Sequence, residues 1–136
     1  MRLLVSPMNM EEAHAALAGG ADILDVKNPK EGSLGANFPW VIRSVVDLAG
    51  GKVPVSATIG DLEFKPGTAS LAALGAASSG ADYIKAGLLG VKTKVQAEEM
   101  LNAIVRAVKD FDPEKKVVAS GYSDHLRVGS ISPILL

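Results

Sequence analysis

The chain is predicted to fold as an α/β protein, specifically as the N-terminal part of a parallel (β/α)₈ or TIM barrel with about five strands. Short apolar segments alternate with helical segments along the sequence, the pattern of βαβ units and a parallel sheet. No glycine-rich nucleotide fingerprint follows the first apolar segment, which disfavours a doubly wound sheet. Polar residues recur near the C-terminal ends of the predicted strands, where barrel enzymes place their chemistry.

The strands are expected wherever a short apolar run lies between turn residues. Pro7 ends the first run, and Pro54 is tolerable because it lies near the start of the third. The predicted strands cover residues 3–6, 23–26, 53–59, 83–86 and 117–120.

The helices follow from composition and from their stop signals. Gly19 and Gly20 end the first helix, and Gly50 ends the second, for which Asn37 is a candidate N-cap with Pro39 in the first turn. The third helix is rich in alanine and is therefore able to pack closely. The predicted helices cover residues 10–17, 37–49, 68–78 and 95–110, and residues 60–67 and 87–94 are expected to be loops.

Length and composition restrict the class of protein. The 136 residues form a single domain, residues 1–136, and a typical barrel needs about 250 residues, so we expect a partial polypeptide. Hydrophobic residues make up 48% and charged residues 21%, a globular balance, and the net charge of -1 gives no general attraction to nucleic acid or to a membrane. With no cysteine and no long apolar stretch, we expect a cytoplasmic protein without thiol chemistry. The exposed edge and apolar face of a half-barrel predict a homo-oligomer.

Two lysines lie in predicted core strands, where an ammonium group is costly to bury. Lys27 and Lys85 each follow the tripeptide Gly-Ala-Asp, and superposing the two repeats places Asp25 on Lys85 and Lys27 on Gly87. Because side chains alternate along a strand, Asp25, Lys27 and Lys85 are expected to face the same way, with room for Lys27 at the level of Gly87. Such a site suits imine formation with a carbonyl substrate.

Each lysine also has a purely structural interpretation. Lys27 attacks a carbonyl only as a neutral amine, a form that desolvation and a nearby cation such as Lys85 favour and that Asp25 opposes. Lys27 would otherwise pair with Asp25 and hold a strand end. Lys85 is a candidate general acid/base, and its alternative is a side chain that extends out of the barrel mouth.

Further candidates for substrate binding are polar residues near strand ends. Ser6, Ser56 and Thr58 are candidates for bonding a sugar phosphate, although such hydroxyls often bond the backbone instead. Asp25 could orient Lys27, contact a substrate hydroxyl or form a structural salt bridge. Asp124 is a candidate for acid/base work together with His125, and Arg127 for holding a phosphate. The loop 30–35 is interpreted as a lid or turn, and no metal or organic cofactor is expected.

Several of these segments together resemble the (5-formylfuran-3-yl)methyl phosphate synthase family, the archaeal, aldolase-like enzymes that open furan synthesis for methanofuran. The resemblance covers essentially the whole chain but only the front part of the family's length. The segments that carry it are Leu4–Pro7, Gly20–Pro29, Glu31–Asn37, Tyr83–Leu88 and Gly121–Ser130.

The resemblance implies a TIM-barrel lyase that condenses two glyceraldehyde 3-phosphate molecules and eliminates phosphate and water. It also implies that Lys27 is the Schiff-base residue and Lys85 the general acid/base. Two alternatives stay open: a class I-type aldolase acting on another phosphorylated carbonyl compound, and an inactive barrel fragment that serves as a dimer or subunit.

Overall fold

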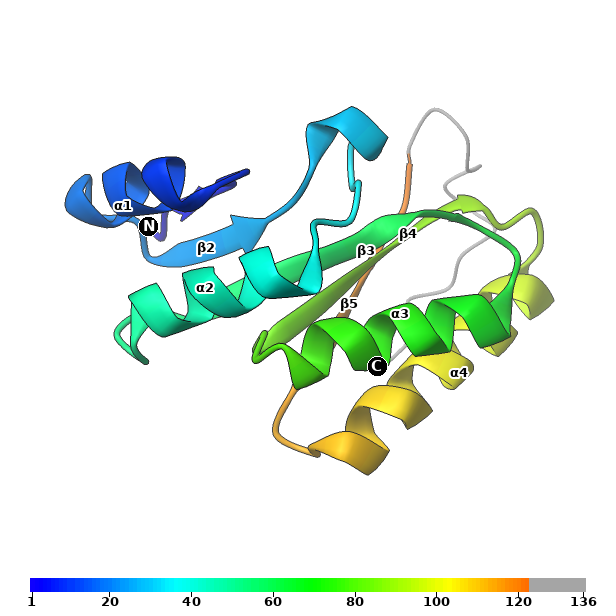
Figure 1. Ribbon diagram of the computed structural model, residues 1–136. Helices are drawn as coiled ribbons and strands as arrows, with labels where there is room; N and C mark the ends of the chain where they lie inside the picture. The colour runs from blue at the N-terminus through cyan, green and yellow to red at the C-terminus, as the bar shows by residue number, and fades with distance from the viewer. Residues whose placement is uncertain (123–136) are drawn as a thin grey trace.

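The computed structural model describes residues 1–122 as a five-stranded parallel sheet with alternating helices (Figure 1). The sheet order β1-β2-β3-β4-β5 follows the chain, and each neighbouring pair is parallel. The predicted α/β class, with about five parallel strands and alternating helices, is thus confirmed. In chain order the elements are β1 (Leu4–Val5), α1 (Met10–Ala18), β2 (Ile23–Val26), the 3₁₀ helix η1 (Pro29–Glu31), α2 (Pro39–Ala49), β3 (Val55–Glu63), α3 (Pro66–Ser78), β4 (Tyr83–Gly90), α4 (Lys94–Phe111) and β5 (Lys116–Ser120).

The helices form one layer on one side of the sheet. Each of α1, α2 and α3 packs against the next helix along the chain, and α2 and α3 also contact strands. Because the strand order never reverses, right-handed crossovers carry every helix to the same face. Among the described residues no helix covers the other face of the sheet, as on the inner face of a barrel wall (Figure 1).

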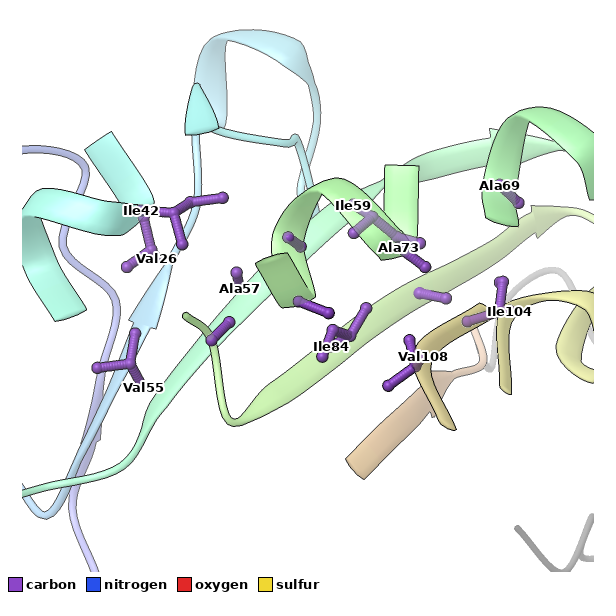
Figure 2. Packing of buried hydrophobic residues seen from close by; sticks show 14 of the residues in the cluster. Val26, Ile42, Val55, Ala57, Ile59, Ala69, Ala73, Ile84, Ile104 and Val108 are labelled. Atoms are coloured by element: carbon purple, nitrogen blue, oxygen red, sulfur yellow. The ribbon is translucent and has the colours of Figure 1, made fainter. Parts of the chain in front are cut away.

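The hydrophobic core lies between the sheet and this helix layer (Figure 2). Every second strand residue contributes, among them Val26, Ala57 and Ile84, each fully buried. The alanine-rich face of α3 includes the buried Ala69 and Ala73, whose small side chains allow the helix to lie close to its neighbours.

The repeated Gly-Ala-Asp tripeptide has a structural role at the starts of the strands. The carboxylate of Asp22 accepts the backbone N–H of Leu3 at 2.6 Å, and that of Asp82 accepts the N–H of Val55 at 2.8 Å. Gly20 and Gly80 precede them with φ of 85° and 105°, a backbone conformation that favours glycine. The repeat therefore fixes where two pairs of neighbouring strands begin.

The largest difference from the predicted elements is at the C-terminal ends of β3 and β4. Both strands continue through segments expected to be loops, to Glu63 and Gly90. Thr58 is the partner of Lys85 and Asp61 that of Gly87, so β3 contains one extra residue between these pairs, a β-bulge.

Asn37 is not the N-cap of α2. The helix begins at Pro39 after Phe38, which makes no side-chain cap bond. The amide group of Asn37 instead donates to the carbonyl oxygens of Met8 and Lys27, at 2.8 and 3.2 Å. The residue therefore joins two strand ends at the mouth of the sheet.

Across residues 1–122, none of the helices combines the length and the apolar character needed to cross a membrane.

Candidate active site on the inner face of the sheet

The face of the sheet away from the helices is hollowed. A hollow of about 340 Å³ is lined by side chains from all five strands: Leu4, Ile23, Ser56, Tyr83, Lys85 and Val118. Its walls are mostly apolar, and Lys85 is the only charged residue among those that line it. Ligand sites commonly combine apolar walls with a few placed polar groups.

Asp25 and Lys85 meet across the intervening strand. The ammonium of Lys85 lies 2.7 Å from Oδ2 of Asp25, and the two side chains are 17% and 1% exposed. Asp25 is level with Ser56 on β3, whereas Lys85 is level with Thr58, so the bond runs obliquely across β3. The predicted convergence of these two residues is present, and the pair is a buried, charge-assisted hydrogen bond.

The hydroxyl of Ser6 extends this network, because it donates to the same Asp25 oxygen at 3.4 Å. The other oxygen, Oδ1 of Asp25, and the hydroxyl of its register neighbour Ser56 are buried without a hydrogen-bond partner in the described part of the chain. Buried polar atoms are nearly always bonded, so an exception calls for an explanation. Ser56 also lines the inner hollow, so a polar group bound there is a candidate partner for these atoms.

Lys27 follows β2 directly and is half-buried. Its backbone is held on both sides: its N–H donates to Pro7 at 3.4 Å, and its carbonyl accepts from Asn37. Within residues 1–122 no carboxylate forms an ion pair with its amine, and Asp25 is bonded to Lys85 instead. The interpretation of Lys27 as the salt-bridge partner of Asp25 is therefore wrong.

The hydroxyl of Thr58 forms hydrogen bonds to the backbone of the protein. This hydroxyl, on a residue that is 1% exposed, donates to the carbonyl of Gly35 at 2.8 Å and lies 3.4 Å from that of Val26. The hydroxyl therefore anchors the segment after β2, which is the structural alternative considered for such residues.

Asp61 lies near the C-terminal end of β3, in a segment that was expected to be a loop. Its Oδ2 accepts the backbone N–H of Leu34 and the hydroxyl of Ser33, both at 3.3 Å, and its Oδ1 accepts the hydroxyl of Tyr122. Strict alternation from Thr58 would turn Asp61 toward the helices, but the bulge places it beside Gly87 on the inner side. A bulge of this kind leaves no reliable pattern in the sequence beyond Gly60, whose φ is 118°.

The expectation that Gly87 leaves room at the level of Lys27 is wrong. A Cβ atom on Gly87 would lie 2.8 Å from the hydroxyl of Tyr122 and 2.9 Å from both Oδ1 of Asp61 and the carbonyl of Gly60. Gly87 instead permits these groups to approach the backbone of β4.

Three further candidate site residues follow Tyr122 in the sequence. Asp124, His125 and Arg127 fall outside the described residues. Among residues 1–122 no group of three or more histidine, aspartate or glutamate side chains is arranged to hold a metal ion.

The family model and the named relatives that match the sequence point to one protein family. A family described as 4-HFC-P synthase matches residues 3–136. Proteins named (5-formylfuran-3-yl)methyl phosphate synthase are 69% identical in Methanosarcina acetivorans and 61% identical in Methanocaldococcus jannaschii, over 100% of this chain and 58% of theirs. The relative from Archaeoglobus fulgidus is 65% identical over 98% of this chain and 57% of its own length.

The chain thus spans somewhat more than half the length of these relatives. A solved structure described as "PhdJ bound to substrate intermediate" shares the fold, with a TM-score of 0.56 at 16% identity over 88% of this chain and 43% of PhdJ. The match to the family over nearly every residue, together with the high identity to its members, shows that the chain belongs to the 4-HFC-P synthase family.

Proposed function

We propose that this chain carries the imine-forming part of a (5-formylfuran-3-yl)methyl phosphate synthase, acting in methanofuran biosynthesis. The substrate is glyceraldehyde 3-phosphate, two molecules of which condense with loss of phosphate and water. The observation that carries the proposal is that the two lysines differ in their bonding to carboxylates. Lys85 is bonded to Asp25, whereas the amine of Lys27 has no carboxylate partner among the described residues.

Lys27 is the proposed nucleophile. Its amine adds to the aldehyde carbon, and loss of water from the adduct gives an imine, which withdraws electrons from the neighbouring carbon. An ion pair would hold the amine protonated, so the absence of one in residues 1–122 suits this role.

Lys85 is the proposed general acid/base. It lines the inner hollow and is hydrogen-bonded to a buried carboxylate, which holds the amine in one position. Repeated proton transfers are needed to eliminate phosphate and water: as the ammonium paired with Asp25, Lys85 donates a proton, and the neutral amine that this leaves accepts the next one, from the carbon next to the imine. Asp25 acts by holding Lys85 and by contacting a substrate hydroxyl, together with Ser56, through Oδ1, which has no partner within residues 1–122.

The test is borohydride trapping with glyceraldehyde 3-phosphate, followed by mass spectrometry to locate the adduct. We expect an adduct on Lys27, its loss in Lys27→Ala, and its persistence at a reduced rate in Lys85→Ala. Lys92→Ala is the matched control, because Lys92 is an exposed residue that follows β4. Normal trapping by the Lys27→Ala variant would overturn the proposal.

Product analysis separates this function from a class I-type aldolase. A furan aldehyde absorbs in the near ultraviolet, whereas a simple aldol product does not. An adduct on Lys27 without a furan product, in a mixture supplemented with the remaining part of a full-length relative, would favour the aldolase.

A further inference from the structure

We propose that Asp61 is a positioning residue that holds the turn after β2 in place and thereby fixes Lys27 at the mouth of the site. The inference rests on the proposed role of Lys27, but the contacts that suggest it are independent of that role. Asp61 is a half-buried carboxylate on β3 that bonds to two other segments of the chain.

The first segment is the turn that follows Lys27. The N–H of Asn28 donates to the carbonyl of Gly35 at 2.8 Å, so residues 28–35 form a loop that is closed at its base. Thr58 bonds the same Gly35 carbonyl from β3. Asp61 bonds Ser33 and Leu34, the two residues of the loop that precede Gly35. The returning part of the loop, residues 33–35, is thus anchored to β3 by both Thr58 and Asp61.

The fit around Asp61 is close on the loop side. A Cβ atom on Gly32 would lie 2.4 Å from Oδ2 of Asp61, and Gly32 has a φ of 131°. A side chain at this position is excluded both by the backbone conformation and by the carboxylate. The loop sequence is therefore shaped to receive Asp61.

The second segment is the residue pair after β5. Tyr122 donates its hydroxyl to Oδ1 of Asp61, above Gly87 of β4. One carboxylate consequently connects the turn after β2, the ends of β3 and β4, and the chain after β5. The ends of β2 and β5 and the turn between β2 and α2 lie toward the same end of the sheet (Figure 1).

The consequence for chemistry concerns the position of Lys27. Lys27 is the residue before the closed loop, and a nucleophile displaced by about 1 Å can lose about a hundredfold in rate. Releasing Ser33 and Leu34 removes one of the anchors of this loop, and leaves the Asn28–Gly35 and Thr58–Gly35 bonds and the backbone bonds of Lys27 to Pro7 and Asn37 to orient Lys27. Asp61 is expected to affect the rate at which a bound aldehyde is attacked, rather than how tightly it is bound.

The experiment compares the chain with its Asp61→Ala variant by two measurements. Amide hydrogen exchange at Leu34 reports on the loop directly, with the Asn28 amide as an internal reference. The concentration dependence of borohydride trapping separates the limiting rate of Lys27 modification from the half-saturating concentration of glyceraldehyde 3-phosphate. Glu63→Ala is the matched control, because Glu63 lies on the same strand but is exposed and forms an ion pair with the exposed Lys65.

We expect the Leu34 amide to exchange about tenfold faster or more in Asp61→Ala. The limiting trapping rate should fall about ten- to a hundredfold, with the half-saturating concentration within about twofold of the original. Ser33→Ala and Tyr122→Phe each remove one hydrogen-bond donor and should give smaller changes in the same direction. These two variants provide the same comparison if Asp61→Ala does not fold.

Unchanged exchange at Leu34 together with an unchanged limiting rate would overturn the proposal. A smaller trapped fraction with an unchanged limiting rate would also overturn it, since that result indicates a purely structural role in folding. If the unmodified chain forms no adduct on Lys27, the proposed function has failed, and the exchange at Leu34 alone decides whether Asp61 holds the loop.

Discussion

The carboxylate of Asp25 bonds the ammonium of Lys85 at 2.7 Å across an intervening strand, and both groups are largely removed from water. The pair lies on the face of the sheet opposite the helices α1 to α4. Lys85 lines an apolar hollow together with Ser56, and within residues 1–122 the hydroxyl of Ser56 and Oδ1 of Asp25 have no hydrogen-bond partner. The following predictions depend on how this pair and its surroundings are packed.

Lys85→Met should lower the free energy of unfolding by about 3–5 kcal/mol, because it leaves a buried carboxylate without its counter-charge. The double variant Asp25→Asn with Lys85→Met should be more stable than Lys85→Met alone. Chemical denaturation of the four proteins in this cycle gives the coupling. Glu98→Gln, which removes an exposed pair with Lys94, should change stability by less than about 0.5 kcal/mol. Equal effects of the buried and exposed variants would contradict the prediction.

Ser56→Ala should leave stability nearly unchanged, because the hydroxyl of Ser56 has no partner to lose among the described residues. If this hydroxyl contacts substrate, the half-saturating concentration in the trapping assay should rise by a factor of about ten, the effect of about 1.4 kcal/mol. Thr58→Val is the contrasting variant, and it should cost about 1–3 kcal/mol of stability through the lost bond to Gly35. The prediction fails if Ser56→Ala destabilises the protein as much as Thr58→Val does.

Gly87→Ala should destabilise the protein by about 1–3 kcal/mol, since the added methyl group overlaps a backbone carbonyl that cannot move independently of β3. Gly75→Ala should instead stabilise it by about 0.5–1 kcal/mol, because Gly75 lies inside α3 and its Cβ would have no close contact. Thermal unfolding of the two variants should therefore shift in opposite directions. A shift in the same direction would show that the space above Gly87 can adjust.

Asn37→Asp should loosen the backbone around Lys27, because a carboxylate cannot donate to the carbonyls of Met8 and Lys27. We expect a loss of stability of about 1–3 kcal/mol and slower trapping at Lys27. Asn9→Asp is the control: Asn9 caps α1 by accepting a bond from Glu12, which aspartate can also do. Wild-type behaviour of Asn37→Asp would show that the Asn37 bonds do not hold the Lys27 segment.

The sequence predicts the parallel α/β class and the meeting of Asp25 with Lys85, because both follow from regular periodicity. Alternation along a strand puts Asp25 and Lys85 on one face, and apolar runs between turn residues locate all five strands. The approach of Asp61 to Ser33 and Tyr122 depends on a departure from alternation, which no local pattern announces. The sequence also does not decide which lysine pairs with Asp25, because alternation places both Lys27 and Lys85 on its face of the sheet. The register of β2, β3 and β4 brings Lys85 to Asp25.

The irregular pairing of β3 with β4 also limits how the protein can vary in length. Between Thr58 and Asp61 the extra residue is on β3, and between Asp61 and Glu63 it is on β4, so Thr58 to Glu63 and Lys85 to Gly90 both span five steps. The two irregularities cancel, so Glu63 pairs with Gly90 at the same sequence offset at which Thr58 pairs with Lys85. A one-residue deletion in β3 alone would carry its offset onward into α3, whereas matched deletions in both strands would not. Insertions and deletions at this point are therefore expected to be tolerated in pairs, one on each strand.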